Sequence, residues 1–128
     1  MDASQIVALY ISINALIILV LSVRVVGGRF NKKISLGTGG DADMEVRIRS
    51  QGNATEYIPI AMIALIALAQ LNAPALVMHL LGAMFTFGRI LHPVGMAGPL
   101  IARQIGTVLT WTALTGFAGA LIWFAFMI

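Results

Sequence analysis

A polar segment between Arg47 and Pro59 contains the side chains of this sequence that are best suited to chemistry. It reads Arg-Val-Arg-Ser-Gln-Gly-Asn-Ala-Thr-Glu-Tyr-Ile-Pro, in a chain of which 59% of the residues are hydrophobic. Arginines and a glutamate are costly to place in apolar surroundings unless they bind a partner. Arginine is also the side chain that pairs best with carboxylates and phosphates. The segment therefore indicates a site for a small anion.

Glu56 is predicted to lie inside a membrane. The apolar run after it, residues 58–71, has 14 residues, whereas a helix needs about 20 to cross a bilayer. If residues 47–71 form one helix, Glu56 lies roughly 22 Å from the far end, several Å inside a hydrocarbon core of about 30 Å. A carboxylate at that depth must be paired or must face a hydrated cavity, which makes Glu56 a functional-site hypothesis.

The polar side chains of this helix are predicted to fall on two faces. At about 100° per residue, Arg49, Asn53 and Glu56 lie within about 60° of one another. Arg47 and Gln51 lie on the opposite face. One helix is therefore expected to serve two polar environments.

Four long apolar segments must position these side chains. We expect helices over about 6–26, 43–71, 74–91 and 101–127, which leave almost nothing for a soluble domain. Only 10% of the residues are charged, as is typical of a membrane protein. The amino terminus lacks the basic region of a secretory signal, so the first segment is expected to be retained. The sequence predicts an all-α integral membrane protein, a four-helix bundle in a single domain over 1–128.

Composition also excludes several functions. The net charge is +3, but the basic residues flank membrane segments instead of forming a solvated patch, which argues against nucleic acid binding. The absence of cysteine excludes a disulfide and a cysteine nucleophile. His79 and His92 are isolated from other ligand types, so no metal site is predicted. His79 is more simply a packing partner in an apolar run.

The connections between the segments have distinct compositions. Residues 27–40 are basic and then glycine-rich, as expected of a flexible connector. Asp41 is a plausible N-cap, and Asp43 and Glu45 in the following turn are expected to serve the fold alone. Residues 92–99 contain two prolines and two glycines, which predicts a break in the helix. Small residues at Thr112/Gly116, Thr115/Gly119 and Gly116/Ala120 indicate close helix packing or oligomer contacts.

The distribution of basic residues predicts the orientation. Lys and Arg are enriched in cytoplasmic loops. Six of the eight flank the first connection, two flank the third, and none lies near the turn at residues 70–74. Both termini are therefore expected to face away from the cytoplasm, and the basic residues gather with Glu56 at the cytoplasmic end.

The pattern Arg49-x-Gln51-x-Asn53-x-x-Glu56-Tyr57-x-Pro59 resembles the second-helix signature of the MAPEG family, the membrane-associated proteins of eicosanoid and glutathione metabolism. Outside this motif, three arginines resemble those at the ends of the family's first and third helices and at the start of its fourth. They are Arg24, Arg89 and Arg103. The connector Ser35-Leu-Gly-Thr-Gly-Gly is most similar to the bacterial branch, which implies a multi-pass protein of the bacterial inner membrane.

The resemblance implies a homotrimer with glutathione bound between protomers at the cytoplasmic end. Arg103 would stabilise the glutathione thiolate and act as the catalytic residue. Glutathione would be bound by Arg24, Arg49, Gln51, Asn53, Glu56, Tyr57, Arg89 and His92. Of these, Arg24 and Gln51 would reach the site of the neighbouring protomer. The implied activity is that of a glutathione transferase or peroxidase acting on hydrophobic electrophiles that arrive from the membrane lipid.

The chain departs from the eicosanoid-making relatives at two positions. They have tyrosines where this sequence has His92 and Met96, and a methionine cannot donate a hydrogen bond. The alternative is therefore a non-catalytic module of the same family that binds a membrane lipid or a small anion. A small proton-coupled exporter is disfavoured, because such a transporter carries its essential glutamate in the first helix, where this chain has only Asn14.

Overall fold

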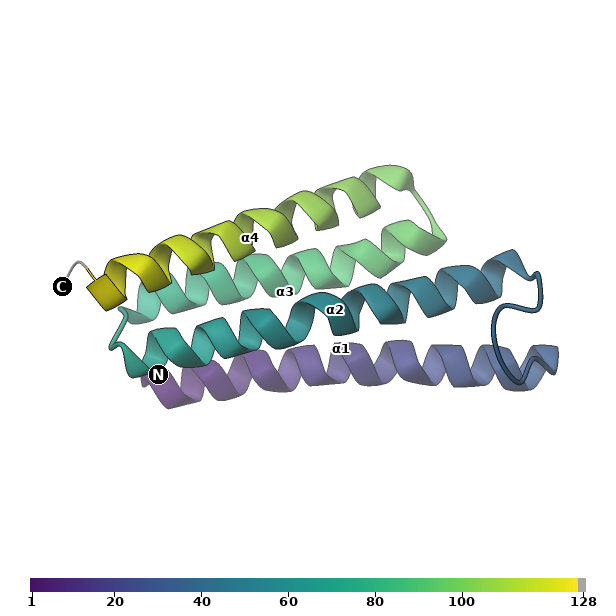
Figure 1. Ribbon diagram of the computed structural model, residues 1–128, viewed down its shortest axis with the longest axis horizontal. Helices are drawn as coiled ribbons and strands as arrows, with labels where there is room; N and C mark the ends of the chain where they lie inside the picture. Colours follow the sequence, from purple (N-terminus) through teal and green to yellow (C-terminus); the bar gives the residue numbers. More distant parts are fainter. Residues whose placement is uncertain (127–128) are drawn as a thin grey trace.

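The computed structural model describes residues 1–126 and shows four long antiparallel helices (Figure 1). The helices are α1 (Ala3–Lys32), α2 (Ala42–Gln70), α3 (Ala75–Ala97) and α4 (Leu100–Phe126). No strand occurs in residues 1–126. All four helices are long and apolar enough to cross a membrane, which confirms the predicted all-helical membrane fold. The predicted end of the last helix, residue 127, lies outside the described residues.

α1 extends further than the predicted 6–26 at both ends. It begins with a capping box. The Asp2 carboxylate accepts a hydrogen bond from the backbone N–H of Gln5, and the side-chain oxygen of Gln5 accepts one from the backbone N–H of Asp2. At the other end it continues through Gly27 and Gly28, which were expected to lie in the connector. A side chain at Gly28 would meet Arg47 of α2 at 2.9 Å. The absence of a side chain at Gly28 therefore lets α2 pack closely against this part of α1.

α3 also continues past its predicted end at residue 91, through His92 and Pro93 to Ala97. Proline removes one helical hydrogen bond and normally bends or stops a helix. Here the turn after Pro93 packs against the start of α4, so closely that a side chain at Gly95 would overlap the backbone of Arg103. This packing stabilises the last turn of α3 and offsets the hydrogen bond that proline cannot make.

A network of ion pairs joins the end of α1 to the start of α2. Asp41 caps α2 by accepting from the Met44 amide, as predicted, and pairs with Lys32 at 2.7 Å. Asp43 pairs with Lys32 at 3.2 Å and with Arg47 at 2.9 Å. The hydrogen bond from Lys32 and then that from the Met44 amide hold the pKa of Asp41 below its ordinary value. These ion pairs thus hold the end of α1 and the start of α2 together across the short connector.

α2 and α3 form the centre of the bundle, because α1 and α4 each pack on both of them and do not touch one another in the described residues. The closest approach is between α3 and α4. A side chain at Gly106 would meet the backbone nitrogen of His92 at 2.7 Å and the Gly88 carbonyl at 2.9 Å. Of the small residues singled out in α4, Gly116 also packs closely, since a side chain added there would meet Leu81 of α3 at 2.5 Å, whereas nothing lies within 4 Å of one added at Gly119.

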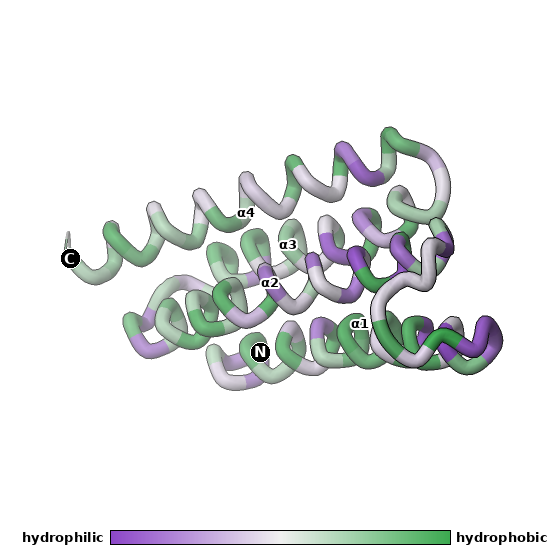
Figure 2. The backbone as a smooth tube through the Cα atoms, turned by 45° about the vertical axis from the view of Figure 1, so that its right-hand side comes forward, coloured by the Kyte–Doolittle hydropathy of each residue, from purple (hydrophilic) through white to green (hydrophobic). Residues whose placement is uncertain are grey.

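Polar residues gather at one end of the molecule. Hydrophilic colour concentrates near the α1–α2 and α3–α4 connections, whereas the end with both chain termini is mostly hydrophobic (Figure 2). All eight Lys and Arg residues lie in the parts of the helices near these two connections or in the first of them. The fold therefore brings together in space the basic residues that the sequence distributes over four segments.

Candidate functional site

A polar cavity of about 420 Å³ opens at this basic end, where α2, α3 and α4 meet. It is lined by Ala42, Glu45, Val46, Arg49, Asn53, His92, Met96 and Arg103. Two guanidinium groups, an amide, an imidazole and a carboxylate thus face one volume. Four of these side chains, Arg49, Asn53, His92 and Arg103, are predicted site residues.

α2 contributes the first wall of the cavity. Arg49 and Asn53 are four residues apart, so they stand one above the other on one face of the helix. Arg49 also pairs with Glu56 at 3.8 Å, which confirms that these residues share a face. Both side chains are 57% exposed, and an ion pair of that kind contributes about 0–1 kcal/mol. Arg49 therefore remains available to bind an anion.

Arg89 of α3 stabilises the α2 side of the cavity without lining the cavity itself. Its side chain is 2% exposed and donates one hydrogen bond to the Asn53 side-chain oxygen at 2.7 Å. The guanidinium carbon lies 5.4 Å from the centre of the Tyr57 ring, in the range of a cation–π contact. The Tyr57 hydroxyl in turn accepts a hydrogen bond from the Trp111 indole at 3.2 Å. These contacts fix the orientation of Asn53 at the cavity.

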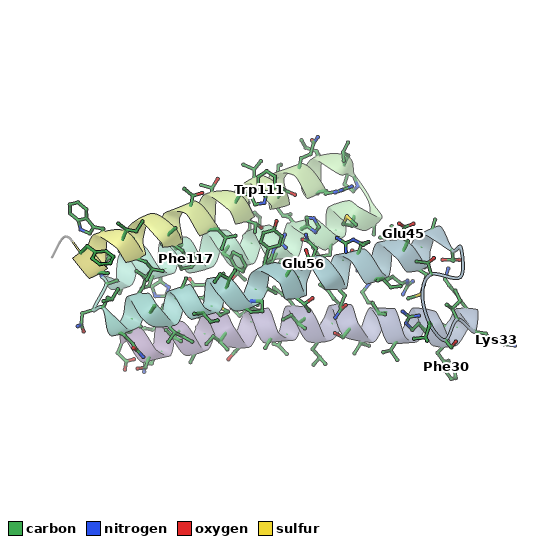
Figure 3. All side chains as sticks on the ribbon, in the orientation of Figure 1. Phe30, Lys33, Glu45, Glu56, Trp111 and Phe117 are labelled. Atoms are coloured by element: carbon green, nitrogen blue, oxygen red, sulfur yellow. The ribbon has the colours of Figure 1, made fainter. Side chains whose placement is uncertain are left out.

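α3 and α4 contribute the opposite wall. His92 is buried, whereas Arg103 is exposed in the first turn of α4. Their separation is set by the glycine contacts at Gly95 and Gly106, which hold α4 against α3. Figure 3 shows Glu45 on α2 towards the connection end of the bundle, with Glu56 further along the same helix.

Not every predicted binding residue lines the cavity. Glu56 and Tyr57 contact residues of the site without bordering the cavity themselves. Arg24 lines a separate groove between α1 and α3. Arg47 donates a hydrogen bond to the Arg24 carbonyl at 3.0 Å, so its face of α2 points towards α1. Gln51 makes no side-chain hydrogen bond within residues 1–126 and lies away from the cavity.

Four lining residues were not among the predicted site residues, namely Ala42, Glu45, Val46 and Met96. Glu45 was expected to serve only the start of α2, yet it borders the cavity. Its spacing of four residues from Arg49 was a signal that both share a face. Met96 was noted only as a departure from the tyrosines of relatives. It reaches the cavity because α3 remains helical past Pro93.

The chemistry of the cavity suits a small polar ligand with charges of both signs. Two arginines can bind carboxylates, and Glu45 can pair with an ammonium group. The described residues contain no group of three His, Cys, Asp or Glu side chains that could hold a metal ion. The cavity volume of about 420 Å³ lies within the range of about 300–1,000 Å³ typical of small-molecule sites.

The fold and the cavity together define a small four-helix membrane protein with a polar site at the basic end of its bundle. Residues 7–123 match the MAPEG family, and the chain belongs to this family. It is similar to the inner membrane protein YecN of Escherichia coli K12, with 33% identity over 118 residues that cover 91% of this chain and 90% of the relative. YecN of Escherichia coli O6:H1 matches over the same length with the same identity.

Proposed function

We propose that this protein is a glutathione-dependent transferase or peroxidase of the bacterial inner membrane that acts on hydrophobic electrophiles. One observation carries the proposal most directly. Arg49, Asn53 and Arg103, which resemble family residues, converge on one cavity with His92, so that three different helices contribute to it. Such convergence is expected of a binding site and has no evident role in packing.

The cavity offers a partner for each charge of glutathione, which has two carboxylates and one ammonium group. Arg49 and Arg103 are suited to its carboxylates or to its thiolate, and Glu45 or Glu56 to its ammonium group. Asn53, oriented by Arg89, offers an amide to the peptide backbone of the ligand. The open side of the cavity leaves room for residues of a second protomer.

Arg103 is proposed to activate the thiol. Only the thiolate is strongly nucleophilic, and a nearby cation lowers the pKa of a thiol. The sulfur would form a bond to the electrophilic carbon of a substrate and displace its leaving group. With a hydroperoxide it would instead attack the terminal oxygen and break the O–O bond, which releases an alcohol and leaves a glutathione sulfenic acid. A second glutathione would convert this acid to glutathione disulfide and water. A lipid-dissolved electrophile held beside this thiolate would gain from proximity, because the reaction becomes effectively intramolecular.

Assembly as a homotrimer would give a role to Arg24 and Gln51, two of the predicted residues that do not line the cavity. Neither side chain lines the cavity of its own protomer, and Arg24 lines the groove between α1 and α3. In the proposed trimer they contact glutathione bound to a neighbour. By the positive-inside rule, the basic end is proposed to lie at the cytoplasmic face, with both termini on the other side.

A non-catalytic module that binds a membrane lipid or a small anion is the second candidate. Met96 favours it, because this side chain lines the cavity and cannot donate a hydrogen bond to a ligand. Such a module would bind an anion in the cavity without lowering the pKa of a thiol. Thiolate formation therefore distinguishes the two candidates.

The test is an ultraviolet thiolate titration of the detergent-purified protein with glutathione. We expect a saturable thiolate absorbance in the wild-type protein at neutral pH, and its loss in Arg103→Ala. Lys33→Ala is the matched control, because it removes one positive charge at the same end of the bundle but outside the cavity. It should leave the signal unchanged.

Equilibrium binding of radiolabelled glutathione separates the remaining outcomes. Binding without a thiolate signal would contradict the catalytic role and favour the anion-binding module. Absence of glutathione binding in a folded protein would contradict both the activity and the cofactor. An unchanged thiolate signal in Arg103→Ala would show that another residue activates the thiol.

A further inference from the structure

Polar side chains bond across the contact between α1 and α3, two helices that run in the same direction (Figure 1). The Tyr10 hydroxyl lies 3.0 Å from Nδ1 of His79 and donates to the His79 carbonyl at 3.2 Å. Further along both helices, the Asn14 amide donates to the Thr86 hydroxyl oxygen at 2.8 Å. A line of polar contacts therefore runs through the otherwise apolar interior of the bundle.

Arg89 is the next position on this face of α3. It follows Thr86 by three residues, so the two side chains share a face, with roughly 5–6 Å between their Cβ atoms. Arg89 lines the groove between α1 and α3 together with Ile17, which is three residues after Asn14. The Arg89 side chain therefore borders α1 about one helical turn from Asn14.

Asn14 and Arg89 each have one buried polar atom without a hydrogen-bonding partner. Asn14 is fully buried, and Arg89 is 2% exposed. Among the residues that the structure describes, Oδ1 of Asn14 accepts no hydrogen bond and Nε of Arg89 donates none. Such atoms are costly, and each needs an explanation. Oγ of Ser50 is also without a partner there, but a hydroxyl can rotate towards a carbonyl of its own helix.

Neither Asn14 nor Arg89 can satisfy its free atom by rotating. Nδ2 of Asn14 donates to the Tyr10 carbonyl at 2.9 Å and to Thr86 at 2.8 Å. Reversing the amide would bring its oxygen against the Tyr10 carbonyl oxygen, and both are acceptors. Arg89 is held in turn by its hydrogen bond to Asn53. Both free atoms therefore need a partner from outside the two side chains.

We propose that one internal water molecule bridges Oδ1 of Asn14 and Nε of Arg89. The chemistry of the two atoms selects water. An anion would be repelled by the amide oxygen and a cation by the guanidinium group, whereas water donates to the first and accepts from the second. A water with two hydrogen bonds of about 2.7–3.2 Å spans roughly 4–6 Å, which suits groups one helical turn apart. Buried waters commonly bridge polar groups of this kind.

The bridge makes Asn14 a positioning residue for the polar cavity. Arg89 donates to Asn53, which lines the cavity. The water orients Arg89 from the α1 side, and Asn53 orients it from the α2 side. Within the described chain α1 contributes no lining residue to the cavity, yet it helps in this way to fix one of the cavity walls. This inference rests on the contacts of Asn14 and Arg89 and not on the proposed glutathione chemistry, so either can fail without the other.

The test is nuclear magnetic resonance of the purified protein with isotopically labelled arginine in lipid nanodiscs. Arg89→Lys, which keeps the charge but has no Nε, identifies the Arg89 Nε–H signal by its disappearance. We expect magnetisation transfer from water to this Nε–H group in the wild-type protein. A rotating-frame measurement separates a bound water from chemical exchange by the sign of the transfer.

Asn14→Leu removes the acceptor with little change in side-chain size and should abolish this transfer. Thr110→Val is the matched control, because Thr110 is 1% exposed and its hydroxyl bonds to Gly106 of its own helix. It removes a buried polar group elsewhere in the bundle and should retain the transfer. If Asn14 served only to pack α1 on α3, Asn14→Leu would also leave the Arg89 signal unchanged.

A double-mutant cycle on thermal unfolding gives a second, independent measurement. Asn14→Leu and Arg89→Lys each break the same bridge. The double variant should therefore lose clearly less in melting temperature than the sum of the two single losses.

Three results would overturn the proposal. Absence of transfer from water to the Arg89 Nε–H group in the wild-type protein would show that no water is bound there, whether or not Asn14→Leu folds. Transfer that is retained in Asn14→Leu would show that the water does not bond to Asn14. Additive losses in melting temperature would show that Asn14 and Arg89 act independently.

Discussion

At the scale of single residues, the site depends on the buried guanidinium group of Arg89 and its hydrogen bond to a neutral side chain. Arg89 is almost fully buried, and Asn53 provides its one side-chain hydrogen bond within residues 1–126. Tyr57 adds a cation–π contact from the other side. The wall of the cavity is thus oriented by a side chain that does not itself border it, and Asn53 has both a structural and a binding role.

Asn53→Ala should destabilise the protein by about 1–3 kcal/mol, because it leaves a buried guanidinium without its acceptor. Asn53→Asp keeps an acceptor oxygen in the same place and should recover most of this stability. Thermal unfolding in detergent measures both. Thr55→Ala serves as the control, since Thr55 is exposed and bonds only within its own helix. Equal melting temperatures for Asn53→Ala and Thr55→Ala would show that Arg89 has another partner.

At the scale of the helices, α3 and α4 form the most closely packed pair in the bundle. Gly88 and Gly95 of α3 and Gly106 of α4 lie where an added side chain would meet backbone atoms of the other helix. This contact brings Arg103 to the cavity beside His92, so the position of a proposed catalytic residue depends on glycines that carry no functional group.

Gly106→Ala should therefore destabilise the fold by about 1–3 kcal/mol through overpacking and should weaken glutathione binding by displacing α4. Gly119→Ala lies in the same helix with nothing within 4 Å of the added carbon, so it should be neutral or stabilising by up to about 1 kcal/mol. Melting temperatures and glutathione titration of both variants are the measurement. Similar losses in both would mean that helix propensity, and not the contact with α3, sets the effect.

The sequence predicts the helices and one face of the site for different physical reasons. Hydropathy determines the four segments, and helical periodicity alone places Arg49, Asn53 and Glu56 on one face. The continuation of α3 past Pro93 was not predictable, since it depends on α4 packing against Gly95. The surroundings of Arg24 could not be predicted from the sequence either, because only the tertiary packing of α1 on α3 shows which groove it borders.

At the scale of the whole molecule, the fold separates two ends of different composition. The antiparallel order of four helices places the first and third connections together at the basic end (Figures 1 and 2). The polar cavity and the Arg24 end of the α1–α3 groove both lie there. The fold thus places the basic residues and the candidate site at the same end of the bundle.

The absence of native cysteine allows this orientation to be tested directly. Ser35→Cys in the first connection should react with a membrane-impermeant maleimide only after the cells are permeabilised. Ser4→Cys, near the start of α1, should react in intact cells with a permeable outer membrane. The positive-inside rule is the physical reason. The reverse pattern of labelling would place the cavity on the non-cytoplasmic side.

The most direct test of the central claim is a crystal structure of the protein with glutathione. We expect one glutathione in each polar cavity, with a carboxylate on Arg49, the sulfur near Arg103, and Arg24 and Gln51 of a neighbouring protomer completing the site in a homotrimer. An empty cavity at saturating glutathione, or glutathione bound elsewhere, would contradict the account.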